Sequence, residues 1–209
     1  AGDADGAGSE SPSINKRSSD VMSTAMSKVF RFLDPMRDLL THVLDGWQPP
    51  KIIVVGDESV GKSTILEQLA MLPVFPRKKR FCTRMCIHVR LRRTPCDPPQ
   101  ASLSVCALLS DTPLAEPTVI PIASGYKYVQ ELMEQLVLEH GGDSGDVVVT
   151  DKQLLLEIRH PEVPSIDLVD VPGLTTYPHS KATAIRSILD ALVEQDHRTG
   201  NHSMFLAIA

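Results

Sequence analysis

The sequence predicts an α/β fold with buried, parallel strands. Residues 51–55 (K-I-I-V-V) form a short, continuous, β-branched run, which is typical of a strand buried on both faces. A glycine-rich loop follows, and residues 63–72 then place apolar side chains at helical spacing until Pro73. Further strands are predicted at 154–158 and 166–169. The centre of the predicted fold is therefore a strand, a glycine loop and a helix in that order.

The middle of the chain predicts an antiparallel hairpin. Residues 85–91 and 103–107 alternate apolar and polar side chains, and a proline-containing turn at 94–99 separates them. This alternation makes His88 an outward-facing strand residue. Residues 108–123 contain several prolines and are predicted to form a connecting loop.

Two more helices and a final strand complete the pattern. The first helix has one apolar face, formed by Val129, Leu132, Met133, Leu136 and Val137, and Gly141 with Gly142 ends it. The second is predicted near 181–193, and the apolar residues 204–209 indicate a buried strand. Because a natural domain rarely ends inside such a strand and Ala1 replaces an initiator Met, we expect a fragment or an incomplete gene model of a longer protein.

The composition is that of one soluble globular domain. The chain has 209 residues, 42% of them hydrophobic, with a net charge of −5. A mildly acidic chain has no general attraction for nucleic acid or anionic membranes, and no apolar run approaches the roughly 20 residues of a membrane span. The cysteines, Cys82, Cys86, Cys96 and Cys106, form no C-x-x-C pair, which favours a reducing cytosolic setting over a disulfide or zinc site.

The N-terminal region predicts a tail and a helix. Residues 1–20 are rich in Gly, Ser and Asp, so they cannot bury enough apolar surface to order themselves. Residues 21–46 carry apolar side chains at spacings of three and four, which predicts an amphipathic helix with a break or kink at Pro35. Periodicity alone favours packing of this helix on its own domain, and docking on a distant segment is the alternative.

The glycine-rich loop at residues 56–63 (G-D-E-S-V-G-K-S) fits the pattern G-x-x-x-x-G-K-[ST]. It lies directly after a predicted strand and directly before a predicted helix, as a phosphate-binding P-loop requires. In such a loop the backbone N–H groups and the helix N-terminus bind phosphate, Lys62 bridges the β and γ oxygens, and the Ser63 hydroxyl ligates Mg²⁺. The sequence therefore predicts a P-loop nucleotide hydrolase.

A second motif, D-V-P-G at residues 170–173, follows the strand at 166–169. Asp170 is expected to hold Mg²⁺ through water, and the N–H group of Gly173 is expected to meet the γ-phosphate. The loop at 174–179 would then respond to hydrolysis. Asp167 points to the opposite face of the same strand and is left out of the site.

The motifs together resemble those of the dynamin family of GTPases. The resemblance rests on residues 56–63, Pro76-Arg77, Thr83-Arg84 and L-V-D-V-P-G at 168–173, and it extends over about 51–209. It implies an extended Ras-like GTPase domain with an incomplete sheet, truncated before the guanine-specificity motif. It also implies that the helix at 21–46 is a bundle-forming helix.

The resemblance assigns further roles. Thr83 is implied to bind Mg²⁺ and position the attacking water, and Ser59 to stabilise charge at the bridging oxygen. Glu58 stands where the family usually has glutamine, so it can accept a hydrogen bond from the water but adds negative charge near the γ-phosphate. The basic residues 78–80 replace a glycine-rich stretch that binds a monovalent cation, so Arg80, or failing that Lys78, is expected to supply the charge as an internal finger. A nuclear-localisation or nucleic-acid patch and a solvated loop are the alternatives for this run.

The predicted site residues fall into three sets. The catalytic set is Glu58, Ser59, Lys62, Thr83 and Arg80. The metal set is Ser63, Thr83 and Asp170. The nucleotide-binding set is Gly56, Asp57, Glu58, Ser59, Val60, Gly61, Lys62, Ser63, Thr64, Asp170 and Gly173.

These observations predict a Mg²⁺-dependent GTPase, with GTP and GDP as ligands. No [NT]-K-x-D motif occurs to select guanine, so a P-loop ATPase or kinase and a nucleotide-binding pseudo-GTPase stay open. The resemblance implies a homodimer through the nucleotide face at full length, and membrane remodelling through segments that this sequence does not contain. The expected location is cytoplasmic, peripheral to membranes or microtubules, with no nucleic-acid partner.

Overall fold

The computed structural model describes residues 28, 29, 32, 36, 49–72, 75, 83–95, 98–141, 146–200 and 203–209. The predicted tail at 1–20 and the basic run with Lys78 and Arg80 lie outside these residues. Of the predicted helix at 21–46, the residues Lys28, Val29, Phe32 and Met36 are described, and they are helical and exposed.

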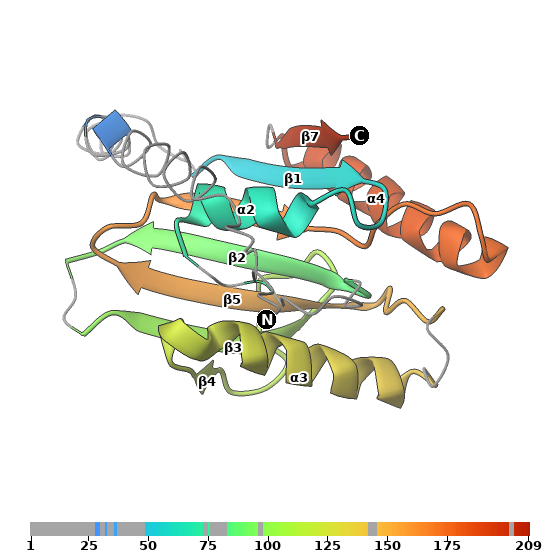
Figure 1. Ribbon diagram of the computed structural model, residues 1–209, viewed down its shortest axis with the longest axis horizontal. Coiled ribbons are helices and arrows are strands. Elements are labelled where there is room, and N and C mark those ends of the chain that lie inside the picture. The colour runs from blue at the N-terminus through green and yellow to red at the C-terminus, as the bar shows by residue number, and fades with distance from the viewer. Residues whose placement is uncertain are drawn as a thin grey trace, which may run out of the picture.

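The described residues form a mixed α/β structure around a seven-stranded sheet with the order β4-β3-β5-β2-β6-β1-β7 (Figure 1). The strands are β1 (Lys51–Gly56), β2 (Cys86–Arg93), β3 (Gln100–Ala107), β4 (Thr118–Val119), β5 (Lys152–His160), β6 (Ile166–Asp170) and β7 (Met204–Ile208). The helices are α2 (Lys62–Ala70), α3 (Gly125–Glu139), α4 (His179–Thr199) and the short 3₁₀ turn η1 (Ile122–Ser124). The short β4 and η1 interrupt the loop that was predicted at 108–123.

Helices cover both faces of the sheet. On one face α2 and α3 contribute Leu66, Val129 and Met133 to a large core with Val54 and Leu168 of the sheet. On the other face Ile188 and Leu192 of α4 pack on a smaller core that includes Ile53 and Val169 of neighbouring strands. Since β1 is parallel to both β6 and β7, the carboxyl ends of β1 and β6 lie at the same end of the sheet. The predicted motifs follow these strand ends.

The predicted hairpin of residues 85–91 and 103–107 is wrong. Both segments are strands, but β5 lies between them, parallel to β2 and antiparallel to β3. Alternation indicates a strand without identifying its neighbour. The continuous apolar run Leu154, Leu155 and Leu156 suits the interior position that β5 occupies, because both of its faces are covered.

The outward position predicted for His88 is also wrong. His88 is 2% exposed, because β2 is an interior strand and the face that carries His88 is covered by other polar side chains. Its Nδ1 lies 3.5 Å from Asp111 Oδ1, and its Nε2 lies 3.2 Å from Asp167 Oδ2. A polar side chain in a central strand is thus buried in an ionic cluster.

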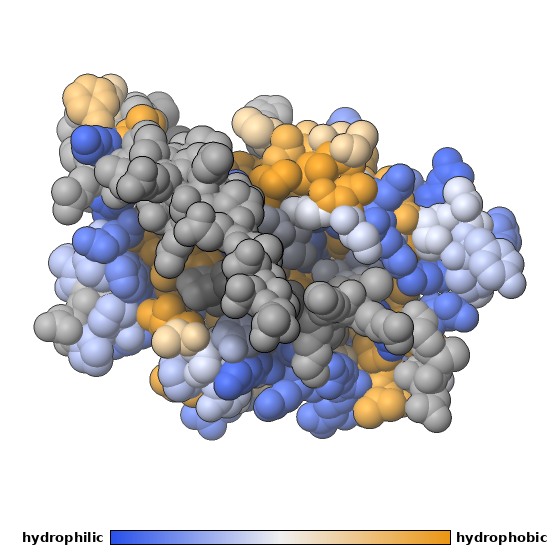
Figure 2. All heavy atoms as spheres, in the orientation of Figure 1, coloured by the Kyte–Doolittle hydropathy of each residue, from blue (hydrophilic) through white to orange (hydrophobic). Residues whose placement is uncertain are grey.

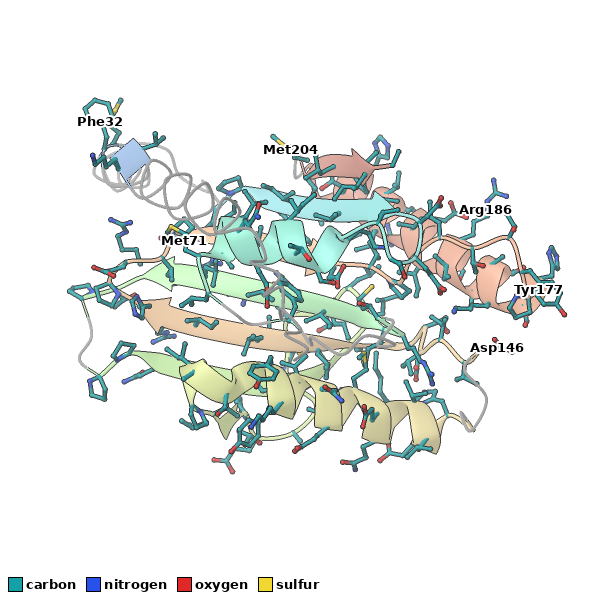
Figure 3. All side chains as sticks on the ribbon, viewed as in Figure 1. Phe32, Met71, Asp146, Tyr177, Arg186 and Met204 are labelled. Carbon is teal, nitrogen blue, oxygen red and sulfur yellow. The ribbon has the colours of Figure 1, made fainter. Side chains whose placement is uncertain are left out.

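The terminal strand forms as predicted but is not buried. Among the described strands β7 pairs only with β1, so it is an edge, and Met204 and Phe205 are 62% and 42% exposed. Figure 2 shows hydrophobic residues gathered over β7 and β1, and Figure 3 shows Met204 at the outer side of this edge. In the described part of the chain, no helix is long and apolar enough to cross a bilayer.

Candidate phosphate and metal site

The glycine loop, residues 56–63, joins the end of β1 to the start of α2. Ser59 and Gly61 have positive φ angles of 66° and 90°, and Gly61 is the N-cap of α2. Left-handed residues in a tight loop turn backbone N–H groups toward one concave side, which favours an anion. The first turn of α2 contains no acidic residue, so no side chain of the helix itself offsets the positive end of its dipole.

Lys62 lies inside this loop. Only 7% of the residue is exposed, and its Nζ donates to the carbonyl oxygens of Gly56 at 3.0 Å and Asp57 at 2.6 Å. A buried ammonium is costly unless polar groups satisfy it, and these carbonyls do so. The loop therefore holds a positive charge against its own backbone.

Three predicted metal residues meet at the end of β6. Asp170 is completely buried, and its Oδ2 accepts hydrogen bonds from Ser63 Oγ at 3.0 Å and Thr83 Oγ1 at 2.9 Å. Thr83 is held in place by the next residue, because Val149 N donates to Arg84 O at 2.9 Å. Residues that are far apart in the sequence thus converge on one carboxylate.

The buried carboxylate of Asp170 is only partly satisfied. Its Oδ1 accepts no hydrogen bond from any described residue. Burial raises the pKa of Asp170 to about 6, although the hydrogen bonds from Thr83 and Ser63 and the charge of Lys62 oppose this rise. Two hydroxyls and an under-satisfied carboxylate are oxygen ligands of the kind that Mg²⁺ prefers. The residues present therefore fit a hard divalent cation.

The segment after Asp170 is docked on the glycine loop. Leu174 N donates to Gly56 O at 3.0 Å, and Glu58 N donates to Leu174 O at 3.4 Å. A Cβ at Gly173 would lie 2.7 Å from Glu58 Cγ and 2.8 Å from Glu58 Cα, so only glycine fits there. The approach of Gly173 to the loop agrees with the predicted motif, and its contact with a γ-phosphate stays a prediction.

Glu58 has an ionic partner that sequence analysis missed. Its Oε1 forms an ion pair with Nζ of Lys181, which lies in the first turn of α4 and is 7% exposed. The sequence places these residues more than a hundred positions apart. Only the complementary charge of a lysine just after the D-V-P-G loop hinted at the pair.

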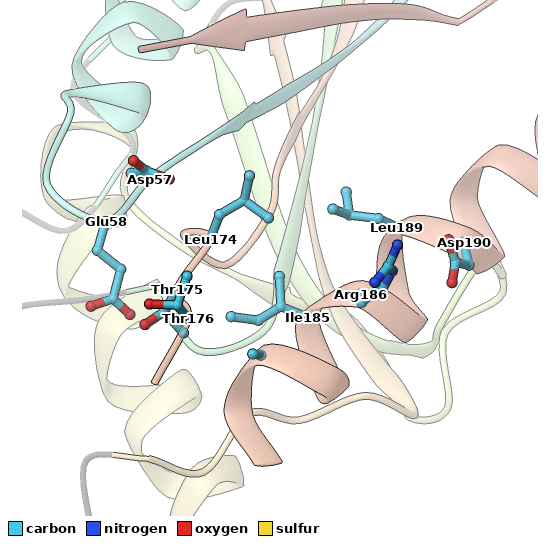
Figure 4. A pocket seen from close by; sticks show the side chains of 10 residues that line it. Asp57, Glu58, Leu174, Thr175, Thr176, Ile185, Arg186, Leu189 and Asp190 are labelled. Carbon is cyan, nitrogen blue, oxygen red and sulfur yellow. The ribbon is translucent and has the colours of Figure 1, made fainter. Parts of the chain in front are cut away.

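A cleft of about 750 Å³ adjoins the glycine loop on the side of α4. Figure 4 shows Asp57 and Glu58 at one side of it, Leu174 to Thr176 in the middle, and Arg186, Leu189 and Asp190 of α4 at the other. Ser63, Thr83 and Asp170 are not among its lining residues. The cleft is thus a neighbour of the oxygen cluster rather than the same site.

The remaining predicted residues divide by position. Asp57, Ser59 and Thr64 are exposed, and Val60 is half-buried, all at the loop or in the first turn of α2. Arg80 lies outside the described residues. Asp167, left out of the predicted site, lies in the ionic cluster with His88 and accepts a hydrogen bond from Arg92 Nη1 at 2.6 Å.

A cysteine or zinc site has no support in the described residues. Cys86 and Cys106 are buried thiols without a disulfide, whereas Cys82 and Cys96 lie outside that part of the chain. The described residues also contain no cluster of three His, Cys, Asp or Glu side chains that could hold a metal.

Comparison with known proteins gives one consistent result. A family model described as "Dynamin family" matches residues 52–196. Dynamin-related protein 4C of Arabidopsis thaliana is 30% identical over 173 residues, which are 78% of this chain and 24% of that protein. Dynamin-related protein 3A of the same plant is 30% identical over 158 residues, or 70% of this chain and 18% of the relative. The interferon-induced GTP-binding protein Mx2 of Sus scrofa is 29% identical over 126 residues, or 60% and 16%. The chain thus spans about a quarter or less of the length of these relatives.

Proposed function

Because the chain belongs to the dynamin family, we propose that it binds GTP with Mg²⁺ at the glycine loop and hydrolyses the γ-phosphate. The observation that carries the proposal is the meeting of Ser63, Thr83 and Asp170 beside the buried Lys62. Phosphoryl transfer needs a phosphate cradle, a lysine and oxygen ligands for a metal in one place. The relevant side chains come together from β6, α2 and the residues before β2.

The metal would be held by Ser63 and Thr83 directly and by Asp170 through water. When bound, Mg²⁺ neutralises charge on the β and γ oxygens. Burial disfavours the ionised form of Asp170 and so raises its pKa. A divalent cation nearby would favour the ionised form instead. The orphaned Oδ1 of Asp170 would then gain a partner.

The other residues would act on the phosphates and the attacking water. Lys62 exchanges a loop carbonyl for the β and γ oxygens, and the loop N–H groups from Asp57 to Thr64 surround the β-phosphate. Thr83 positions the water, Glu58 accepts a hydrogen bond from it, and Ser59 stabilises the bridging oxygen. Arg80 supplies positive charge, as proposed from the sequence.

The domain proposal follows from the family. Residues 51–209 would be the N-terminal part of an extended Ras-like P-loop domain, with β4, β3 and β5 as the extension. Residues 21–46 would be a bundle helix after a disordered tail at 1–20. The preference for GTP over ATP rests on the family, since no guanine-reading motif occurs in this sequence.

Assembly and location are further proposals. GTP binding would promote a homodimer through the nucleotide face of the full-length protein, which would act in the cytoplasm at membranes or microtubules. Any lipid contact would come from other segments of the full-length protein.

Phosphate release in the full-length protein tests the proposal. With saturating GTP and Mg²⁺, we expect turnover above the no-protein control and a loss of about a hundredfold or more in Thr83→Ala, the usual effect of removing one transition-state contact. Thr118→Ala is the matched control, because Thr118 is exposed in β4 at the opposite edge of the sheet. Equal turnover in both variants would contradict the role of Thr83.

Two alternatives have their own tests. A P-loop ATPase would bind ATP as tightly as GTP in a competition between the two nucleotides. A nucleotide-binding pseudo-GTPase is favoured by the glutamate at position 58, and single-turnover release of phosphate distinguishes it. Release at the rate of the no-protein control would favour that alternative.

A further inference from the structure

We propose that Lys181 is a positioning residue of the nucleotide site, whose ammonium neutralises the Glu58 carboxylate so that an acidic side chain can stand beside anionic phosphates. This inference deepens the proposed function and rests on it. It concerns a residue in α4, outside the glycine loop and the D-V-P-G motif.

The contact itself is specific. Oε1 of Glu58 and Nζ of Lys181 form an ion pair, and the Lys181 side chain is 8% exposed whereas that of Glu58 is 32% exposed. Oε1 makes no hydrogen bond in the described part of the chain, so the ammonium is its compensating group there. A lysine this buried has been moved out of water, which is unfavourable unless a carboxylate faces it.

Among the described residues, two other cations near Glu58 do not pair with it. Lys62 Nζ donates to the carbonyls of Gly56 and Asp57. Arg186 lines the same cleft as Glu58, but it forms no ion pair with it among the described residues. Figure 3 shows Arg186 projecting from α4 at the surface of the molecule. Lys181 is therefore the cation that α4 supplies to the glycine loop.

The pair also adds to the contacts between the glycine loop and the segment that follows Asp170. Gly173 packs on the backbone of Glu58, Leu174 exchanges backbone hydrogen bonds with Gly56 and Glu58, and Lys181 returns to the side chain of Glu58. The segment between Asp170 and α4 is thereby attached to the glycine loop at both of its ends. The orientation of the Glu58 carboxylate depends on this attachment.

The chemical need arises from the charge at position 58. A carboxylate close to a γ-phosphate repels it, and the repulsion is strong where the effective dielectric constant is low. An ammonium in contact with that carboxylate makes the pair nearly neutral. GTP, with the γ-phosphate, should depend on this compensation more than GDP does.

A double-mutant cycle tests the inference in the full-length protein. The variants are Glu58→Gln, Lys181→Met and the double variant. The measurement is the Kd of GDP and the Kd of the β,γ-imido analogue of GTP, each in the presence of Mg²⁺. We expect Lys181→Met to weaken the GTP analogue about tenfold, which is about 1.4 kcal/mol, and GDP by less. With glutamine at position 58, the same substitution should change neither Kd, because no carboxylate needs compensation.

Matched variants separate charge from structure. Lys181→Arg should keep wild-type affinity. Arg186→Met removes a positive charge from the same helix, at the cleft that Glu58 lines, and should not reproduce the loss for the GTP analogue. If Lys181→Met fails to fold, comparison of Glu58→Gln with the double variant still measures the effect of Lys181 on affinity in the absence of the Glu58 carboxylate. A lower affinity of the double variant for the GTP analogue would overturn the inference.

The possible results have distinct meanings. Equal weakening of both nucleotides by Lys181→Met, or the same weakening with glutamine at position 58, would show that Lys181 only supports the fold. If the wild-type protein binds neither nucleotide, the proposed function fails and the inference fails with it. If the wild type binds both but the cycle is additive, only the inference fails.

Discussion

Replacing Gly173 with alanine should separate the D-V-P-G loop from the glycine loop. A Cβ there would lie 2.7 Å from Glu58 Cγ, 2.8 Å from Glu58 Cα and 2.9 Å from Glu58 N. The last two atoms belong to the backbone, so a change of side-chain rotamer cannot relieve the overlap. The backbone of one segment has to move.

Two routes lead to a similar cost. If the loop stays docked, overpacking of this kind costs about 1–3 kcal/mol. If the loop retreats, it loses its hydrogen bonds between Leu174 and the backbones of Gly56 and Glu58, at about 1 kcal/mol each. Either way the free energy of unfolding should fall by about 2 kcal/mol, which corresponds to a lower Tm by about 4–8 °C for a domain of this size.

Thermal unfolding followed by circular dichroism measures the effect, with Gly125→Ala as the matched control. Gly125 has the helical φ of −52°, and a Cβ there would lie an ordinary 3.5 Å from Ile120 Cδ1. Alanine should therefore be neutral or slightly stabilising at that position. A Gly173→Ala protein with the same Tm as the wild type would contradict the close approach of Gly173 to Glu58. Preferential loss of GTP over GDP affinity would further support docking of this loop at the γ-phosphate.

Three further predictions follow from burial and charge. Gly56→Ala should lower the free energy of unfolding in urea by about 2 kcal/mol or more and increase hydrogen exchange in β7, because its Cβ would lie 2.2 Å from Ile208 O; unchanged exchange in β7 would count against the pairing of β1 with β7. Burial raises the pKa of Cys86 to about 12 and also raises that of Cys106. Iodoacetamide at pH 8 should therefore label these two thiols only after unfolding, and rapid labelling of either one in the native protein would contradict their burial. Burial opposes ionisation of Asp167, but the contact with His88 and the hydrogen bond from Arg92 outweigh it and lower the pKa of Asp167. A lowered folded pKa gives stability that is present above the unfolded value and lost as the pH falls through the folded one. Asp167→Asn should therefore be less stable than wild type at pH 7, with a gap that narrows toward pH 3, and a constant gap would contradict the ionic role.

Local signals in the sequence predicted the elements that form the site. The β-branched run of β1, the glycine loop and the apolar face of α2 are each specified by neighbouring residues, so their order is visible without a structure. The D-V-P-G motif likewise identified Asp170 by its place after a strand. Ser63 and Thr83 meet at Asp170 in the structure, and their roles at a metal stay a prediction.

Long-range pairing was not visible in the same way. The alternation in β2 and β3 fits any half-buried strand, so nothing local showed that β5 lies between them. His88 was misplaced for the same reason, since its burial depends on Asp111 and Asp167 from other segments. Lys181 is the partner of Glu58 only because the loop after β6 turns α4 back toward the glycine loop.

Equilibrium titration of the full-length protein with Mg²⁺ and GTP measures the proposed nucleotide binding itself. The wild type should bind, and Lys62→Ala should lose binding, because Lys62 is the buried ammonium of the glycine loop. Lys127→Ala is the matched control, since Lys127 is exposed on α3. We expect wild-type affinity in Lys127→Ala and no measurable binding in Lys62→Ala, with ATP unable to compete. Equal affinity for GTP in Lys62→Ala and the wild type would contradict binding of the nucleotide at the glycine loop.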